Sequence, residues 1–229
     1  MKKLIKKIPI FGDLAKRLYW NLGTKKTRPK TFPGSKNYWE ERYAAGGNSG
    51  VGSYEKFAEF KAAVINGFVT KLDLRSVIEF GCGDGNQLTL AKYPTYFGFD
   101  VSETVISKCQ KLFAGDASKH FRLVAEYKGE IADVALSLDV IYHLIEDDIF
   151  ENYMRTLFKS SNQYVIIYAS DSDDNRGLDG THIRHRNFTA WIQQNFPDWK
   201  LIEHIPNKHP YQGDYMQGSF ADFFIYAKA

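Results

Sequence analysis

The stretch SVIEFGCGDGNQL, residues 76–88, decides the fold. Apolar and β-branched residues lead to the acidic Glu79, and three glycines then follow at alternate positions, Gly81, Gly83 and Gly85. A strand that ends in a glycine turn before a helix is typical of cofactor binding in α/β sheets, because glycine lets the backbone approach a ligand closely. A dinucleotide-binding fingerprint, G-x-G-x-x-G, requires glycine at position 86, where the chain has Asn86. The stretch therefore predicts a cradle for a nucleotide-type cofactor and departs from the dinucleotide-binding fingerprint.

A second acidic residue supports this prediction. The segment YFGFD, residues 96–100, is typical of a short buried strand and ends in Asp100. In doubly wound sheets a carboxylate about 20 residues after the first glycine accepts a hydrogen bond from a ribose hydroxyl. Asp100 could instead cap the helix that is expected to begin near Ser102, since aspartate and serine both favour such positions.

The composition limits the class of protein. The 229 residues, 44% of them hydrophobic, are enough for one domain with a short appendage. Cys82 and Cys109 form no C-x-x-C pair and indicate a reducing compartment, where Cys82 simply packs inside the glycine turn. No apolar run approaches the roughly 18 residues of a membrane span, and no cleavage site follows the basic N-terminus. We therefore expect a cytoplasmic protein.

The net charge of +3 conceals an uneven distribution. Residues 1–30 hold ten Lys/Arg and one acid, which leaves 20 basic and 26 acidic residues, or net −6, in the rest. We assign 1–34 to a basic amphipathic N-terminal helical arm and linker. The arm either lies on an anionic membrane surface, as in a peripheral membrane protein, or packs over the main domain as a lid. Its large apolar residues fall at helical spacing: Phe11, Leu14, Leu18 and Leu22.

Strand-like and helical segments alternate through the main domain, which predicts an α/β fold with a parallel, doubly wound sheet. Two final strand-like segments suit an antiparallel hairpin that completes a seven-stranded sheet. A glycine-rich loop at 46–52 is expected to be flexible and to order on a ligand. The expected strands are 76–80, 96–100, 121–125, 133–139, 164–170, 199–206 and 221–228. The expected helices are 55–71, 86–92, 102–114, 146–159 and 188–196.

Polar residues after the fourth expected strand are candidates for chemistry. The segment LSLDVIYHLIEDD places Asp139 at the end of an apolar strand and His143 four residues later. In open α/β sheets ligands bind beyond the carboxyl ends of the strands. His143 could accept a proton from a hydroxyl, because its ordinary pKa lies near 6.5. Alternatively, His143 only shapes the pocket.

A polar segment, THIRHR, supplies candidates for binding a polar or anionic substrate: His182, Arg184, His185 and Arg186. Arginine suits phosphate and carboxylate groups. The two histidines and nearby aspartates could also hold a divalent metal, but their spacing is unspecific and we assign no metal site.

The acidic-x-G-x-G-x-G pattern resembles motif I of class I S-adenosylmethionine (SAM) methyltransferases, which have a Rossmann-like fold. From about Tyr38 onward the chain resembles bacterial members of this class found with glycosyltransferases in surface-polysaccharide gene clusters. The likeness rests on YWEERYAAGGNSGVGSY, VIEFGCGDGNQL, ALSLDVIYHLIEDD, THIRHRNFTAWI and SFADFFIYAK. The basic arm is no part of this pattern. The resemblance implies that residues 35–229 form a SAM-dependent methyltransferase domain.

The resemblance also implies a cofactor site. Glu79 and the three glycines would surround the methionine part of SAM, and Asp100 would bind its ribose. The loop after Tyr38 and Trp39 would close over the cofactor, with Arg42 as a partner for its carboxylate. Further expected cofactor contacts are Cys82, Val101, Trp39 and Asp139, and the expected catalytic residues are His143 and Asp139.

The expected function is O-methylation of a hydroxyl on a sugar or glycan intermediate. Two alternatives stay open: a small-molecule methyltransferase acting on nitrogen, oxygen or a carboxylate, and a non-catalytic SAM-binding module that recruits glycan enzymes to the membrane. Nucleic acid is not expected as a partner, because the main domain is net acidic and LDVIYH replaces the N/D-P-P-Y motif of base methyltransferases.

Overall fold

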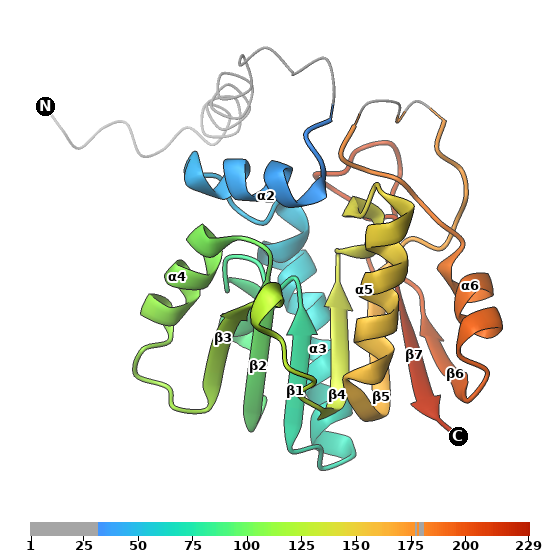
Figure 1. Ribbon diagram of the computed structural model, residues 1–229. Helices are drawn as coiled ribbons and strands as arrows, with labels where there is room; N and C mark the ends of the chain where they lie inside the picture. The colour runs from blue at the N-terminus through green and yellow to red at the C-terminus, as the bar shows by residue number, and fades with distance from the viewer. Residues whose placement is uncertain (1–31, 177, 179–180) are drawn as a thin grey trace, which may run out of the picture. The chain divides into compact units, whose positions relative to one another are not determined.

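The computed structural model describes residues 32–176, 178 and 181–229 (Figure 1). Their core is a seven-stranded sheet with strand order β3-β2-β1-β4-β5-β7-β6. Strands β1 to β5 run parallel, and β7 is antiparallel to both β5 and β6. In chain order the elements are α2 (Ser35–Ala44), η1 (Val51–Ser53), α3 (Glu55–Lys71), β1 (Ser76–Phe80), η2 (Gln87–Leu90), β2 (Thr95–Asp100), α4 (Glu103–Leu112), β3 (Lys119–Leu123), η3 (Val124–Glu126), β4 (Ala132–Leu138), η4 (Ile141–His143), α5 (Asp147–Lys159), β5 (Ser161–Ala169), α6 (Phe188–Asn195), β6 (Trp199–Ile205) and β7 (Asp222–Lys228). The predicted doubly wound sheet with its C-terminal hairpin is confirmed.

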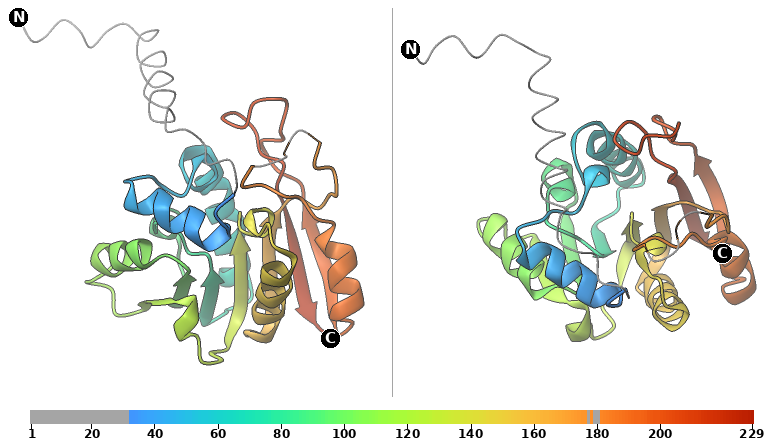
Figure 2. Two further views of the ribbon diagram at one scale, coloured as in Figure 1. Left: turned by 45° about the horizontal axis from the view of Figure 1, so that its top comes forward. Right: turned by 90° about the horizontal axis from the view of Figure 1, so that it is seen from above.

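Helices cover both faces of the sheet (Figures 1 and 2). On one face, the ring of Phe60 in α3 contacts Tyr168 of β5 and Phe223 of β7. On the other, Phe158 of α5 contacts Tyr226 of β7. The central strands are buried from both sides, which explains why they read as nearly continuous apolar runs.

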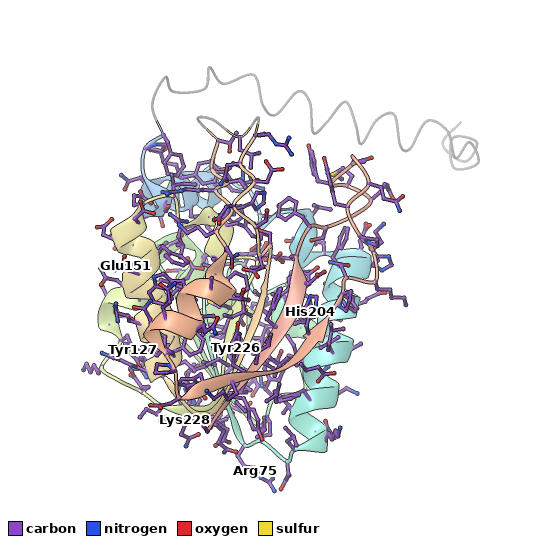
Figure 3. The ribbon with its side chains drawn as sticks, turned by 90° about the vertical axis from the view of Figure 1, so that its right-hand side faces the viewer. Arg75, Tyr127, Glu151, His204, Tyr226 and Lys228 are labelled. Atoms are coloured by element: carbon purple, nitrogen blue, oxygen red, sulfur yellow. The ribbon has the colours of Figure 1, made fainter. Side chains whose placement is uncertain are left out.

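The hairpin forms the far edge of the sheet. Figure 3 shows this side of the molecule, with His204 on β6 and Tyr226 and Lys228 on β7 labelled. Within the hairpin, His204 pairs with Phe224 across the strands, and their rings stack 4.6 Å apart. Cross-strand pairs of this kind stabilise an antiparallel ladder.

Two predicted elements differ from the structure. The expected helix 86–92 is only the single 3-10 turn η2, and the chain is extended from Ala91, where Asn66 of α3 donates to the Leu90 carbonyl oxygen and accepts the Lys92 N–H, both at 2.9 Å. The expected strand 121–125 is β3, which begins and ends two residues earlier. It ends at Leu123 because the Glu126 carboxylate accepts the Leu123 backbone N–H at 2.9 Å. Other strand and helix ends differ by a few residues.

The strand order reverses direction between β1 and β4, so the carboxyl ends of these two strands mark the switch point of the sheet. Both ends point toward the top of Figure 1, where α2 and the loops after β5 and β6 gather. Of the predicted N-terminal arm and linker, residues 1–34, residues 1–31 lie outside the described residues. Among the described helices, none is long and apolar enough to cross a membrane.

Candidate functional site

The turn after β1 has a backbone that requires glycine. Gly81 has φ +84° and Gly83 has φ +58°, both in the left-handed region. A Cβ atom on Gly81 would lie 2.5 Å from Val140 Cγ2, and one on Gly83 would lie 2.5 Å from Ser49 Oγ. The turn is thus a cradle that any side chain would fill. Gly85, with φ +79°, faces the C-terminal end of α4.

Backbone and thiol contacts hold this glycine turn in place. The N–H of Gly81 and that of Cys82 both donate to the carbonyl oxygen of Phe99, at 2.7 and 3.1 Å. Cys109 of α4 donates its thiol to the carbonyl oxygen of Gly83 at 3.2 Å. Both cysteines are buried and free. Cys82 therefore packs beneath the turn, as the sequence indicates.

Asp100 lies directly beside the glycine turn. Its Oδ2 accepts the Gly83 N–H at 3.0 Å, and its Oδ1 accepts the Ser102 N–H at 3.1 Å. Ser102, not Asp100, caps α4 by accepting the Val105 N–H. Burial raises the pKa of Asp100 to about 6, although these backbone donors act in the opposite direction. The alternative role as a helix cap therefore belongs to Ser102, and Val101 lies between the two residues, half-buried.

Glu79 is buried beneath the turn. Its Oε2 accepts the hydroxyl of Tyr96 at 2.5 Å. Burial raises the pKa of Glu79 to about 7, against the opposing effects of Tyr96 and of the ammonium of Lys61. A buried carboxyl with a raised pKa is common at functional sites.

A segment before α3 covers the glycine turn; we call residues 35–53 the cover segment. The backbone N–H of Asp84 donates to Ser49 Oγ at 2.8 Å, and the hydroxyl of Tyr54 donates to Asp84 Oδ2 at 2.5 Å. The hydroxyls of Tyr43 and Ser49 lie 3.0 Å apart. The glycine-rich loop 46–52 is therefore seated on the turn through Asp84, which is buried.

Two further predicted cofactor residues lie on the cover segment. Arg42 donates its Nε–H to the carbonyl oxygen of Asn48 at 2.7 Å, and its guanidinium lies 5.6 Å from the centre of the Trp39 ring. The Trp39 ring in turn contacts His143 edge-on at 4.9 Å. Trp39 thus brings the cover segment against the residues that follow β4, and Arg42 lies beside Trp39.

Asp139 follows β4 in a left-handed backbone conformation, with φ +60°. The Lys61 ammonium lies 2.5 Å from Asp139 Oδ2, and the Tyr142 hydroxyl donates to Asp139 Oδ1 at 2.6 Å. Lys61 also lies 5.2 Å from the centre of the Tyr168 ring. The side chain of Lys61 is 1% exposed and that of Asp139 is 14% exposed.

Lys61 is a site residue that the sequence-based analysis missed. It lies in α3 on the same buried stripe as Phe57, Ile65 and Val69, at four-residue spacing. A lysine on an apolar helical stripe must find a counter-charge, because an unpaired buried charge is very unfavourable. That spacing was the available signal.

His143 lies at the end of η4, half-buried among other rings. Its Nδ1 lies 2.9 Å from the carbonyl oxygen of His182, so Nδ1 carries the proton and Nε2 keeps a lone pair. The His143 ring stacks on the His182 ring at 5.0 Å, and the Tyr38 ring stacks on His182 at 4.5 Å. Burial, together with the nearby His182, lowers the pKa of His143 to about 3. The imidazole is therefore neutral at physiological pH.

The two predicted substrate-binding arginines contact the chain between η4 and α5. Arg186 donates to the carbonyl oxygens of Leu144 and Ile145, and Arg184 also donates to Ile145. Both guanidinium groups pair with the Asp147 carboxylate, at 3.0 and 2.9 Å. Arg186 is buried, so these contacts stabilise the η4–α5 connection.

His185 lies nearer the ends of the strands. Its Nδ1 lies 2.5 Å from the Ser170 hydroxyl, directly after β5, and its ring contacts Phe220 at 4.7 Å. Burial lowers the pKa of His185. The structure therefore brings His143, His182 and His185 to one end of the sheet, while Arg184 and Arg186 are engaged by the protein itself.

The charges at this end of the sheet fit SAM, whose sulfonium and amino groups are positive. Three carboxyl groups lie at this end, Glu79 in β1, Asp100 at the last position of β2 and Asp139 directly after β4, and Lys61 is the buried cation among them. A glycine turn with a carboxylate beside it is the arrangement in which doubly wound sheets bind a nucleoside. Within residues 32–176, 178 and 181–229, no group of three metal-ligating side chains is present.

Comparison with known proteins agrees with this geometry. A family model described as a methyltransferase domain matches residues 53–218. Among curated proteins, none matches the sequence significantly.

Three solved structures have a similar fold. The N-methyltransferase NodS from Bradyrhizobium japonicum WM9, in complex with S-adenosyl-L-homocysteine, is 13% identical, with TM-score 0.63 and coverage of 85% of this chain and 98% of that chain. Magnesium protoporphyrin IX methyltransferase from Synechocystis PCC 6803, with the same ligand, is 13% identical, with TM-score 0.61 and the same coverage of 85% and 98%. The methyltransferase domain of bacterial CtHen1 is 17% identical, with TM-score 0.55 and coverage of 73% and 97%.

Proposed function

The chain belongs to the methyltransferase domain family and is a SAM-dependent enzyme, and on that premise we propose that it methylates a hydroxyl of a sugar or glycan intermediate. The products are a methyl ether and S-adenosylhomocysteine. The observation that carries the proposal is a group of aromatic and imidazole side chains at the end of β4, close to the glycine turn. The group consists of Tyr38, Trp39, His143 and His182. The solved structures with this fold differ in acceptor and are under 20% identical, so they do not distinguish between acceptors.

The residues of this chain that would hold SAM are those around the cradle. Gly81 and Gly83 let the turn pack closely against Val140 and Ser49 and would present its backbone to the cofactor, and Asp100 would offer a carboxylate to the ribose hydroxyls. Arg42, on the cover segment, would pair with the cofactor carboxylate. When bound, SAM supplies a methyl group on a positively charged sulfur, which is a strong electrophile.

Aromatic rings favour a sugar-like acceptor over an anionic one. Trp39, Tyr38 and Phe220 are all half-buried and lie around the histidines at this end of the sheet. Binding sites of this kind combine apolar and aromatic walls with a few fixed polar groups. Three carboxyl groups nearby, two of them buried, disfavour an acceptor that carries a negative charge at the reacting atom.

Asp139 and His143 are the two candidates for the proton of the acceptor hydroxyl. His143 presents Nε2 as an acceptor but binds a proton weakly, because its pKa is about 3. Methyl transfer to an oxygen depends on in-line positioning more than on strong basicity. Two donors, Lys61 and Tyr142, fix the Asp139 carboxylate, so we place it first and give His143 the task of shaping the pocket together with His182 and His185.

The acceptor class is tested with SAM carrying a tritiated methyl group and fractionated cell extract. We expect label in the lipid-linked glycan fraction with the wild-type protein and much less with Asp100→Ala at a SAM concentration near the wild-type dissociation constant. Label confined to small molecules, protein or nucleic acid would contradict the glycan acceptor. SAM binding without label in any fraction would favour a non-catalytic SAM-binding module.

The basic arm, residues 1–34, is proposed to bring the enzyme to an anionic membrane surface where lipid-linked glycans are found. Its ten basic residues within positions 1–30 support this proposal. We expect the full-length protein to float with vesicles that contain phosphatidylglycerol, and a variant with Lys2, Lys3, Lys6 and Lys7 changed to glutamine to float less. Equal flotation of both would instead favour the arm as a lid.

A further inference from the structure

The ion pair between Lys61 and Asp139 joins α3 to the end of β4, 78 residues apart in the sequence. From it we infer that Lys61 is a positioning residue: it holds the Asp139 carboxylate in place and aimed at the acceptor, where Asp139 receives the hydroxyl proton. The inference rests on the proposed transfer to a hydroxyl and names the residue on which that transfer depends.

The first argument is how firmly Asp139 is held. Its backbone N–H donates to the carbonyl oxygen of Tyr168 at 2.9 Å, and each carboxylate oxygen has one donor, Lys61 or Tyr142. A carboxylate oxygen can accept two hydrogen bonds, so each keeps one position for a further donor. Its φ of +60° is uncommon for a residue with a side chain and persists only where the surroundings enforce it.

The second argument is the local charge. Asp139 faces Lys61 from α3, Tyr142 from η4 and Tyr168 from β5, and it interacts with Glu79 of β1, which also feels Asp100 of β2. Among the described residues two other basic side chains are largely buried, Arg186 and Lys119, and they pair with Asp147 and Asp116. Lys61 is therefore the cation that offsets these carboxylates.

The third argument is the chemistry of the transfer. A lone pair of the acceptor oxygen forms the bond to the methyl carbon, and the electron pair of the carbon–sulfur bond stays on sulfur. The acceptor oxygen becomes more positive during this step, and its O–H proton passes to Asp139. A fixed carboxylate stabilises that developing charge without rearranging. Because Lys61 and Tyr142 hold Asp139 from its other sides, the lysine acts through Asp139 and has no need to touch the acceptor.

The test compares Lys61→Met with the matched control Lys71→Met, which removes an exposed lysine from the last turn of the same helix. Calorimetry measures the dissociation constant for SAM, and tritiated SAM with the glycan fraction of cell extract gives kcat and KM between pH 6 and pH 9. We expect Lys61→Met to bind SAM within threefold of wild type and to lose at least 30-fold in kcat at pH 7. Lys71→Met should match wild type.

A second variant covers the case in which Lys61→Met fails to fold. Lys61→Met/Asp139→Asn removes both charges together and leaves no unpaired ion. We expect it to fold, to bind SAM, and to transfer methyl as slowly as Asp139→Asn alone, because the lysine acts only through the aspartate. A kcat equal to that of wild type in Lys61→Met or in Asp139→Asn would overturn this inference and leave the proposed function standing. Loss of SAM binding in step with kcat would place Lys61 in the cofactor site and would also overturn it. Absence of transfer by the wild-type protein would remove the proposed function, and this inference with it.

Discussion

Replacing Glu79 by glutamine tests the electrostatics of the cofactor site directly. Glu79 is buried at the end of β1, and its partner is the hydroxyl of Tyr96. Glutamine has nearly the same shape as the protonated carboxyl group and cannot ionise. The variant therefore removes one buried negative charge and leaves the packing of the strand unchanged.

The magnitude follows from the pKa of Glu79, which burial raises from its ordinary 4.5 to about 7. Because one pKa unit is worth about 1.4 kcal/mol, ionising Glu79 in the folded protein costs about 3 kcal/mol more than in the unfolded chain. The folded state binds the proton more tightly, so this penalty is absent well below pH 4.5 and complete above pH 7. The wild-type protein thus loses about 3 kcal/mol of unfolding free energy as pH rises through this range. Glu79→Gln has no carboxyl group at this position and does not incur this loss.

Urea unfolding at pH 4 and pH 8, without SAM, measures the effect. The free energy of unfolding of Glu79→Gln, relative to wild type, should increase by about 3 kcal/mol between the two pH values. Asp100 titrates in both proteins and cancels from this comparison. Glu151→Gln, on the exposed surface of α5, is the matched control and should show no such change. A difference for Glu79→Gln that stays constant with pH would refute the reasoning.

Three further predictions concern the parts of the site around the cradle. Asp84→Ala removes the acceptor of the Tyr54 hydroxyl, so it should lower stability by about 1–3 kcal/mol and speed hydrogen exchange in residues 49–54; unchanged exchange would show that Asp84 does not hold the cover segment. His143→Ala should bind SAM normally and lose less than about tenfold in turnover, whereas a loss of roughly 10²-fold or more in the labelled-methyl assay would return the general-base role to His143. Arg186→Leu should cost about 2–4 kcal/mol in urea unfolding because it removes the guanidinium donor of the Leu144 carbonyl oxygen and one of the two donors to Ile145; a cost below about 0.5 kcal/mol would contradict its structural role.

The fold was predictable because its signals are local. The glycine turn, the carboxylate after β2 and the alternation of apolar strands with helices each depend on short segments of sequence. The prediction of a helix at 86–92 was wrong because the glycine pattern implied a full helix, while contacts with Asn66 of α3 hold the chain extended after Leu90. The early end of β3 depends on a hydrogen bond from Glu126, which no periodicity reveals.

The site was predictable only in part. Asp100, Asp139 and His143 follow strands, where the topology of the sheet places functional residues. Lys61 comes from α3, upstream of the glycine turn, and its importance depends on a tertiary contact with Asp139. Arg184 and Arg186 carry the charge that substrate binding would need, but their partners Ile145 and Asp147 become visible only when the chain is folded.

The most direct test of the account is the affinity for SAM of the wild-type protein and of Asp100→Ala, measured by calorimetry with Asp116→Ala as a control on the exposed loop after α4. The account predicts one SAM per chain for the wild-type protein. It also predicts a dissociation constant about 5- to 150-fold weaker in Asp100→Ala, which corresponds to the roughly 1–3 kcal/mol of a charged hydrogen bond to the ribose. Asp116→Ala should bind as the wild type does. Equal affinity in all three proteins would contradict the placement of the cofactor between the glycine turn and Asp100.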